Sequence, residues 1–367
     1  MRVSAPLPRS DRIDERLARR GGALELLRPL SAVYAGLARL RARGYEHGWL
    51  PAGRVDVPVV SVGNLSAGGT GKTPFVAFLA HELERRALRV GILSRGYGAP
   101  KESAARENDE ARWYARTLPA VEREQDPDRL AGAQRLVERG VEVILLDDGF
   151  QHRRLARDLD LVLVDATRPW GLPAAPGGGF VQACFPRGFL REPPSALARA
   201  DALCVTRADQ VGEAERAALL AELAELAPGK PLFLGAHRPS ALQAPDGRTL
   251  APEALRGRAV ELVSALGNPE AFERTVRALG AEVVVHRRFP DHHLYSAADL
   301  AGLGRDGRWL VTSEKDATKL AGLAPAHVLA ARFELLAGAP VLEALLDGMP
   351  RARARRERAA LHEGLHG

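Results

Sequence analysis

Lys72 and Thr73 end a segment whose residue types suit phosphate binding. Residues 59–73 read VVSVGNLSAGGTGKT, an apolar run that passes into a glycine-rich turn. Glycine tolerates the backbone angles that turn N–H groups inward, so the amides of residues 68–71 could surround an anion. At this spacing the Lys72 ammonium would reach the β- and γ-phosphates of a nucleotide, and the Thr73 hydroxyl would coordinate Mg²⁺. The segment therefore predicts a nucleoside triphosphate site that uses magnesium.

This loop departs from the commonest phosphate-loop pattern at two positions. Ser66 stands where that pattern has its first glycine, and Ala67 stands where a variant pattern has an extra lysine. The alternative is a chance glycine turn, but the order of strand, loop, Lys-Thr and helix favours a phosphate loop. The predicted nucleotide-binding residues are Ser66, Ala67, Gly68, Gly69, Thr70, Gly71, Lys72 and Thr73.

A second apolar run ends in two carboxylates. Residues 143–148 read VILLDD, which places Asp147 and Asp148 at the end of a predicted strand. In a phosphate-loop protein this is where a carboxylate holds Mg²⁺, directly or through water. Neighbouring strand residues point to opposite sides, so one aspartate could face the metal and the other the attacking nucleophile. The alternative is a solvated strand end; the upstream phosphate loop favours the metal site.

Polar residues follow two further strands. SRGYG carries Arg95 and Tyr97, and GFQHRR carries Gln151 and His152. Ligands collect at the carboxyl ends of strands in open α/β sheets, so these side chains are candidates for phosphate or substrate contacts. Arginine in such a place is often only solvated, and for Arg95 both interpretations stay open.

The segment FPDHHLY at 289–295 groups Asp291 with His292 and His293. Two histidines are too few for a closed zinc site without distant ligands. A carboxylate that orients an imidazole for general-base support fits better. A structural cluster between domains is the alternative. A looser pattern, TRAD at 206–209, echoes the guanine-reading signal of GTP-binding proteins but lacks its lysine.

Composition limits the class of protein. A chain of 367 residues is long enough for two domains, and its net charge of +6 suits an acidic ligand, an anionic lipid or a nucleic acid. No nucleic-acid motif appears, so we expect no nucleic-acid partner. Residues 1–20 are charged and lack the apolar core of a signal peptide, and no uncharged run is long enough to span a membrane. Two cysteines without metal spacing predict no disulfide framework.

The elements that must position these residues alternate between strands and helices. This alternation predicts an α/β fold with a mostly parallel, P-loop NTPase-like sheet flanked by helices, and a second, smaller α/β domain. We expect a first domain at 1–195, a second at 196–350 and a basic tail at 351–367. Residues 1–22 read as a frayed, charged lead-in.

Residues 23–43 predict an amphipathic helix that is interrupted near Pro29. Arginines flank its apolar stripe, a pattern typical of helices that lie in a membrane interface. The alternative is that the stripe packs on its own domain. The stripe consists of Leu26, Leu30, Val33, Leu37 and Leu40.

The ordered set of motifs resembles the tetraacyldisaccharide 4′-kinase family, from about Leu24 to about Leu345. The motifs are VPVVSVGNLSAGGTGKTP, ILSRGYG, NDE, LLDDGFQHRRLARD, LREP, ALGNPEAF, FPDHHLY and VTSEKDATKL. The resemblance implies transfer of the ATP γ-phosphate to the 4′-hydroxyl of a tetraacyldisaccharide 1-phosphate, with Mg²⁺, in lipid A biosynthesis. It also implies peripheral attachment to the cytoplasmic face of the bacterial inner membrane through the helix at 23–43, with no obligate protein partner.

The resemblance also assigns residues. Asp109 matches the aspartate that acts as catalytic base, His292 matches the histidine that supports it, and Arg191 of LREP is a candidate for substrate contact. Asn108 and Ala111 depart from the family's glycine and proline, which leaves Glu110 as a rival for Asp109 and His293 as a rival for His292. Two other functions remain: a GTPase or ATPase of the metallochaperone kind, and a non-catalytic membrane-binding scaffold.

Overall fold

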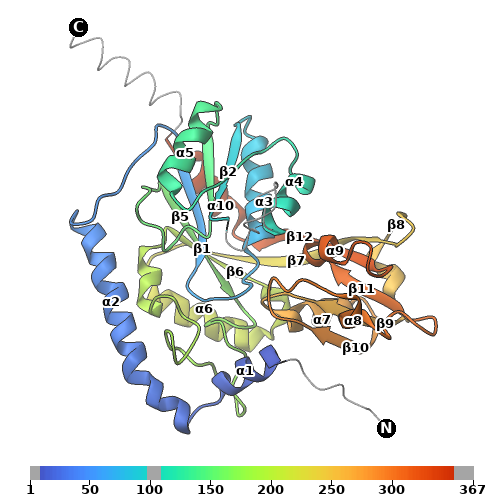
Figure 1. Ribbon diagram of the computed structural model, residues 1–367. Helices are drawn as coiled ribbons and strands as arrows, with labels where there is room; N and C mark the ends of the chain where they lie inside the picture. Colours follow the sequence, from blue (N-terminus) through green and yellow to red (C-terminus); the bar gives the residue numbers. More distant parts are fainter. Residues whose placement is uncertain (1–8, 97–108, 351–367) are drawn as a thin grey trace.

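In the computed structural model, which describes residues 9–96 and 109–350, twelve strands form one sheet (Figure 1). The strands are β1 (Val59–Asn64), β2 (Val90–Ser94), β3 (Glu122–Gln125), β4 (Val143–Asp147), β5 (Leu159–Asp165), β6 (Ala202–Thr206), β7 (Leu232–Gln243), β8 (Thr249–Leu250), β9 (Ala259–Ser264), β10 (Glu282–Arg288), β11 (Trp309–Ser313) and β12 (His327–Ala337). Their order is β10-β9-β11-β12-β7-β6-β5-β1-β4-β2-β3, with β8 paired to β7. Only the β7–β12 and β7–β8 pairs are antiparallel among the described strands. The predicted α/β fold with a mostly parallel sheet is confirmed.

Helices cover both faces of this sheet. They are α1 (Arg9–Ala18), α2 (Arg28–Glu46), α3 (Lys72–Glu84), α4 (Asp109–Thr117), α5 (Arg129–Glu138), α6 (Glu213–Leu226), α7 (Pro269–Ala278), α8 (Ala297–Leu300), α9 (Glu314–Leu320) and α10 (Ala339–Asp347), with 3₁₀ turns η1 (Ala23–Leu27), η2 (Pro194–Arg199), η3 (Ala208–Gln210) and η4 (Pro252–Leu255). The helix starts follow local sequence signals. Asp128 caps α5 by accepting hydrogen bonds from two backbone amides, and Asn268 caps α7 just before Pro269.

The central strands are continuous apolar runs because both of their faces are covered. Every residue of β1, β2, β4 and β6 is buried. On one face of the sheet, α4 and α10 pack with Phe75 and Leu79 of α3. On the other face, α5 and α6 pack against the strands through Leu136 and Leu223. The carboxyl ends of β1, β2 and β4 therefore form a rigid edge from which loops can extend.

Two long antiparallel strands, β7 and β12, join a first unit, which contains β1–β6, to a second unit, which contains β9, β10 and β11 with helices α7, α8 and α9. The start of β7 pairs with β6, its remainder pairs with β12, and the start of β12 pairs with β11 (Figure 1). The chain then returns to the first unit, because Phe333 of β12 and Leu342 of α10 lie in its core. Since β6 also follows residue 195 but pairs with β5, the division at 195 stays a prediction.

The expected frayed lead-in is wrong for the part of it that the structure describes. Residues 9–18 form helix α1, and Ala18 is buried with Leu172 and Val181. Asp14 of α1 lies 3.5 Å from the Arg168 guanidinium. The charged sequence did not predict this helix, because the packing of α1 depends on contacts with residues far along the chain.

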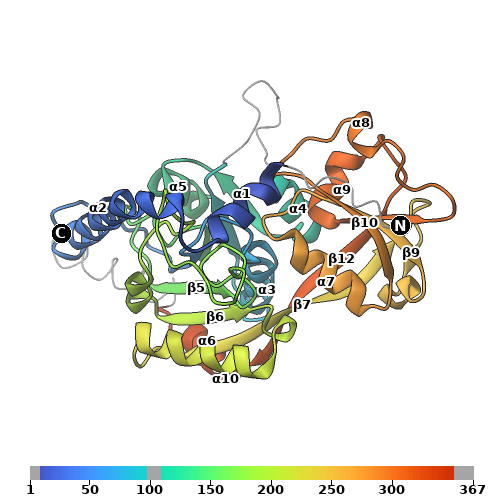
Figure 2. The ribbon, with the colours of Figure 1, turned by 90° about the horizontal axis from the view of Figure 1, so that it is seen from below.

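Helix α2 lies on the outside of the first unit, on the side away from the second unit (Figures 1 and 2). Its inner face carries the small buried residues Ser31, Ala35 and Ala42. The five residues of the predicted apolar stripe are between 58% and 79% exposed. The alternative, in which this stripe packs on its own domain, is therefore excluded. None of the helices in the described ranges is long and apolar enough to cross a membrane.

Candidate functional site

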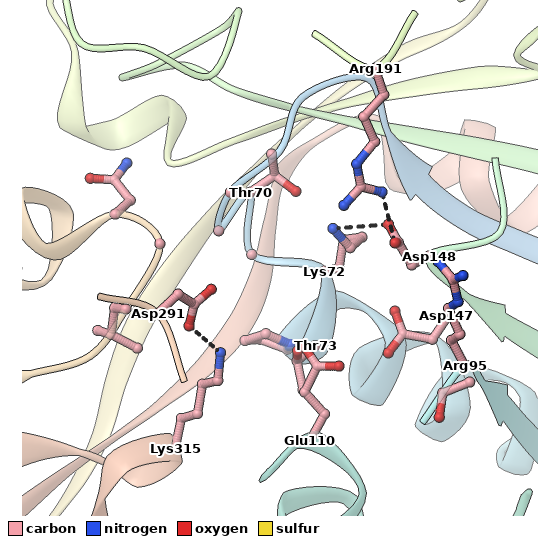
Figure 3. A pocket seen from close by; sticks show the side chains of 18 of the residues that line it. Thr70, Lys72, Thr73, Arg95, Glu110, Asp147, Asp148, Arg191, Asp291 and Lys315 are labelled. Carbon is pink, nitrogen blue, oxygen red and sulfur yellow. Dashed lines mark hydrogen bonds and ion pairs between the residues drawn. The ribbon is translucent and has the colours of Figure 1, made fainter. Parts of the chain in front are cut away.

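A cleft of about 1080 Å³ lies between the two units and takes residues from both. Its first side, the P-loop wall, consists of Gly68–Thr73 with Asp147 and Asp148 at the end of β4. Its second side, the facing wall, is lined by His292 and Lys315, and the buried pair Asp109 and Lys319 lies directly next to His292. Figure 3 shows Lys315 and Asp291 across from Lys72 and Thr73.

The P-loop wall has the backbone that its glycines allow. Gly68 and Gly71 have φ angles of 124° and 84°, which favour glycine. A Cβ atom on Gly71 would lie 2.3 Å from the His237 ring, so this position also has no room for a side chain. Lys72 begins α3, and its Nζ donates to Asn64 Oδ1 at 2.9 Å. The predicted loop and helix are confirmed as a strand–loop–helix unit.

Contacts from later strands hold the P-loop from outside. The Ala67 amide donates to the Phe189 carbonyl, the Thr206 hydroxyl donates to the Thr70 carbonyl at 2.9 Å, and Arg207 donates to the Gly69 carbonyl at 3.0 Å. Thr206 and Arg207 are the first residues of TRAD, the segment with a weak likeness to a guanine reader. In this structure they bind P-loop carbonyls and so support the loop.

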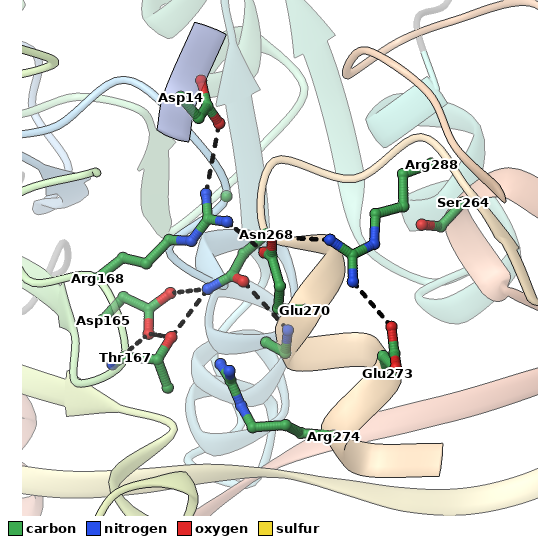
Figure 4. A network of polar contacts seen from close by, with 12 residues as sticks. Asp14, Asp165, Thr167, Arg168, Ser264, Asn268, Glu270, Glu273, Arg274 and Arg288 are labelled. Carbon is green, nitrogen blue, oxygen red and sulfur yellow. Dashed lines mark hydrogen bonds and ion pairs between the residues drawn. The ribbon is translucent and has the colours of Figure 1, made fainter. Parts of the chain in front are cut away.

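The second unit also touches the P-loop directly. A Cβ atom on Gly267 would lie 2.2 Å from the Gly69 nitrogen, so the two backbones are in contact. The next residue, Asn268, donates to Asp165 and Thr167 beyond the end of β5. Figure 4 shows this bridge next to a chain of charges in which Arg168 contacts Glu270 of α7. The position of the P-loop and the position of the second unit are therefore mechanically linked.

Asp147 is a buried carboxylate that forms no salt bridge with any residue in the described ranges. Its Oδ2 accepts a hydrogen bond from the Tyr114 hydroxyl at 2.9 Å. Burial raises the pKa of Asp147 to about 7, and the negative charge of Glu110 adds to the effect. Within the described residues, no group of three or more His, Cys, Asp or Glu side chains is arranged to hold a metal ion.

Asp148 differs from its neighbour in conformation and in partners. It has a φ angle of 54°, which turns it away from the line of β4. Its carboxylate lies 3.3 Å from Lys72 Nζ and 2.7 Å from Arg191 Nη1 (Figure 3). Although burial opposes it, these two cations hold the pKa of Asp148 well below its usual range. As the sequence predicted, the two adjacent aspartates face different surroundings.

The facing wall joins Asp109 to residues from the second unit. Asp109 Oδ2 lies 2.7 Å from Lys319 Nζ and 3.5 Å from His292 Nδ1. The rival histidine, His293, stacks on Phe289 and contacts Asp299 instead. Glu110, the rival of Asp109, points toward Thr73 and Asp147 (Figure 3). The structure therefore brings together the Asp109–His292 pair that the resemblance assigned.

The remaining predicted residues have different surroundings. Arg95 and His152 line the cleft, and burial among arginines lowers the pKa of His152 to about 4. Gln151 also lines the cleft, where its amide donates to the Asn64 carbonyl, and Arg191 pairs with Asp148. Tyr97 lies outside the described residues.

Sequence reasoning assigned no role to several residues in or next to the cleft, although it noted that Lys315 and Lys319 fall within a motif. Arg129 is 3% exposed and lines it, with an Nε atom that has no partner among the described residues. Lys315 and Lys319 lie on the first and second turns of α9. A signal for both lysines existed, because lysine is rare in this chain and both belong to VTSEKDATKL. No local pattern marked Arg129, because it looks like any first-turn helix arginine.

Comparisons with known proteins agree with this geometry. The family model described as tetraacyldisaccharide-1-P 4′-kinase matches residues 23–350. A tetraacyldisaccharide 4′-kinase of Anaeromyxobacter dehalogenans (strain 2CP-C) is 43% identical over 343 residues, which cover 86% of this chain and 88% of the relative. The crystal structure of LpxK from Aquifex aeolicus in complex with ATP is 32% identical, with a TM-score of 0.68 over 89% of this chain and 98% of that one. The chain therefore belongs to the tetraacyldisaccharide-1-P 4′-kinase family.

Proposed function

We propose that this protein transfers the γ-phosphate of ATP to the 4′-hydroxyl of a tetraacyldisaccharide 1-phosphate, a step of lipid A biosynthesis. One observation carries the proposal: the P-loop lines a cleft whose other side carries His292, which lies 3.5 Å from the buried carboxylate of Asp109. A donor site and a proton acceptor in one cleft are what a kinase needs, whereas a GTPase needs no acceptor wall. The family membership of the chain supports the same reaction.

The P-loop wall would bind the triphosphate. Backbone N–H groups of residues 68–71 surround the phosphates, and Lys72 leaves Asn64 and Asp148 to contact the transferred group. Lysine is a compact cation on a flexible stem, so this change needs only new side-chain rotamers. Most catalysis of phosphoryl transfer comes from such positioning and charge stabilisation.

Thr73, Asp147 and Asp148 would hold Mg²⁺. The residues fit a hard cation, because Asp147 is a carboxylate whose pKa is raised by burial first and by the negative charge of Glu110 second. Bound Mg²⁺ would offset charge on the phosphates as the bond to the leaving group breaks. Asp148 turns toward Lys72 and Arg191, so its share in the metal site would be through water.

Asp109 would act on the acceptor. The acceptor O–H bond breaks and its proton moves to the Asp109 carboxylate, while the sugar oxygen bonds to the γ-phosphorus. The bond from that phosphorus to the bridging oxygen breaks, and ADP leaves. His292 would steady the carboxylate from 3.5 Å. Arg95, Tyr97, Gln151, His152 and Arg191 remain proposed contacts to the substrate.

The exposed stripe of α2 would bind the membrane surface that carries the lipid substrate. Contiguous exposed apolar residues mark interaction sites, and arginines beside them suit anionic headgroups. We propose peripheral association with the cytoplasmic face of the inner membrane. The Leu30→Ser/Leu37→Ser variant should lose binding to vesicles of anionic phospholipid, whereas Leu336→Ser, at an exposed leucine of β12, should not. Equal vesicle binding by both variants would contradict this role.

A transfer assay tests the main proposal. Radiolabelled ATP, Mg²⁺ and a tetraacyldisaccharide 1-phosphate in detergent micelles should give a labelled lipid, and the label should be at the 4′ position. GTP should be a poor donor. Fast GTP hydrolysis without a lipid product would instead support the metallochaperone-like alternative and overturn the kinase assignment.

A further inference from the structure

Among the residues that the structure describes, Asp109 makes its shortest ion-pair contact with a lysine of the second unit, not with the histidine. Lys319 Nζ lies 2.7 Å from Asp109 Oδ2, and the two side chains are 2% and 9% exposed. His292 lies farther, at 3.5 Å from the same oxygen, and its side chain is 36% exposed. We propose that Lys319 is a positioning residue for the reaction: it fixes the Asp109 carboxylate and supplies its main counter-charge. This inference depends on the proposed kinase function.

Lys319 is itself held in place. Its Nζ lies 3.5 Å from Asp316 Oδ1, and Asp316 is fully buried. The other oxygen of Asp316 accepts hydrogen bonds from the Ala265 amide at 3.0 Å and the Ser313 hydroxyl at 2.9 Å. A chain of buried contacts therefore connects the Lys319 ammonium, through Asp316, to the ends of β9 and β11. Such a chain fixes where the ammonium, and so the carboxylate, must lie.

The contact also joins the two units. Asp109 begins α4 of the first unit, and Lys319 belongs to α9 of the second. At the other end of α4, Arg116 donates to the Glu314 carbonyl at 3.1 Å. Both ends of α4 are thus tied to α9. Separating the units would break both contacts, so the ion pair and the Arg116 hydrogen bond favour the closed cleft.

Lys319 also decides which carboxylate oxygen is left for the acceptor. Both Lys319 and His292 contact Oδ2. The ion pair of Asp109 with Arg112, of the same helix, has its contact at Oδ1 instead, at 3.9 Å. Oδ1 therefore remains available to accept the hydrogen bond, and then the proton, of the sugar hydroxyl.

The charges around Asp109 come from three elements. Arg112 and Glu110 belong to α4, Lys315, Asp316 and Lys319 belong to α9, and Asp291 and His292 belong to the loop after β10. Burial alone would raise the pKa of Asp109, but hydrogen bonds from His292 and Lys319 lower it to about 2. The carboxylate is therefore ionised near neutral pH, and its protonation would contribute to the acidic limb of the pH profile.

The test compares Lys319→Met with the matched Lys230→Met, which removes a lysine outside the cleft. We expect Lys319→Met to lower kcat about 100-fold, near the lower end of what a general base contributes, with the KM for ATP within about twofold. The acidic limb of the kcat/KM–pH profile should move upward by about one unit, because Asp109 loses an opposite charge. Lys319→Arg should recover part of kcat, and Lys230→Met should behave as wild type.

Lys319→Gln is a second variant for the case in which Lys319→Met does not fold. It keeps a hydrogen-bond donor at this position but removes the positive charge. Its thermal unfolding and circular dichroism should show a folded protein, with the same shift in the pH profile. A folded Lys319→Gln or Lys319→Met enzyme with wild-type kcat and an unmoved acidic limb would overturn the inference. If wild-type protein makes no labelled lipid, the proposed function itself fails, and that outcome is distinct.

Discussion

A buried aspartate lies at each wall of the cleft, and the two differ in their partners: only Asp109 forms salt bridges with described residues. Asp147 on the P-loop wall lies near Glu110 and accepts one hydrogen bond from Tyr114, and its pKa is raised to about 7. Asp109 on the facing wall contacts Lys319 and His292, and its pKa is lowered to about 2. Burial raises the pKa of both carboxylates, and only at Asp109 do neighbouring cations outweigh that effect.

This contrast shows how one cleft can hold two carboxylates for two purposes. The ionised form of a buried carboxylate that has no paired cation is unfavourable, and a bound cation stabilises it. This property suits a proposed metal ligand. A carboxylate that already has its cation stays ionised and fixed, which suits a group that must receive a proton in a set direction. The lysines follow the same division: Lys72 is partly exposed and able to change partners, whereas Lys319 is buried and held.

The largest expected effect comes from the mobile lysine. Lys72→Met should lower kcat roughly 10³-fold, because the charge that stabilises the transferred phosphate is removed. ATP affinity should fall as well, which isothermal titration with ATP and Mg²⁺ can measure. The melting temperature should also fall, since the fully buried Asn64 Oδ1 loses the hydrogen-bond donor that Lys72 supplies. If Lys72→Met had the same ATP affinity and kcat as Lys230→Met, the proposed role of Lys72 in binding the transferred phosphate would be wrong.

The second test concerns the fixed pair. Asp109→Asn should lower the free energy of unfolding by about 3 kcal/mol, because it leaves the Lys319 ammonium buried with only the more distant Asp316. Urea unfolding followed by fluorescence measures this loss. Asp246→Asn, at an exposed aspartate outside the cleft, serves as the control and should change stability by less than about 0.5 kcal/mol. Equal effects of the two variants would mean that the ion pair carries no stability.

The pH dependence of stability sharpens the same point. The folded pKa of Asp109 lies below its unfolded value, so its contribution is present above about pH 4 and is lost as the pH falls toward 2. The stability difference between wild type and Asp109→Asn should therefore shrink by about 2 kcal/mol over that range. Urea unfolding of both proteins at several pH values gives the curve. A difference that stays constant down to about pH 2 would contradict the lowered pKa.

The two walls also differ in how well the sequence predicted them. The P-loop wall is contiguous, and its glycines, Lys72 and Thr73 have a fixed spacing that a single chemistry explains. The facing wall joins Asp109 to Lys319 from distant parts of the chain. Family resemblance supplied Asp109 and His292, but no spacing rule could place Lys319 against them. Contacts between distant segments are set by packing, which a local pattern does not record.

The fold shows the same limit. The apolar runs of β1, β4, β5 and β6 were predictable because buried parallel strands have few polar residues. Strand β12, HVLAARFELLA, was missed because it carries charges and bridges two units, so neither alternation nor a continuous apolar run marks it. Helix α1 was missed because only Leu17 and Ala18 contact a core, and that core is built by residues beyond 170.

The smallest expected effect is the most direct test of the contrast, because it has the opposite sign. Asp147→Asn should raise the free energy of unfolding of the nucleotide-free protein by about 1 kcal/mol, while phosphate transfer is lost. The substitution removes a buried charge that faces Glu110, and the carbonyl oxygen of the introduced amide can still accept the Tyr114 hydrogen bond. Asp148→Asn is a control one residue away: it takes the partner from Lys72 and Arg191, so it should lower stability. If both asparagine variants lowered stability, the negative charge of Asp147 would already be neutralised within the protein. The contrast between the two aspartates would then be wrong, because Asp147 would not need a bound cation.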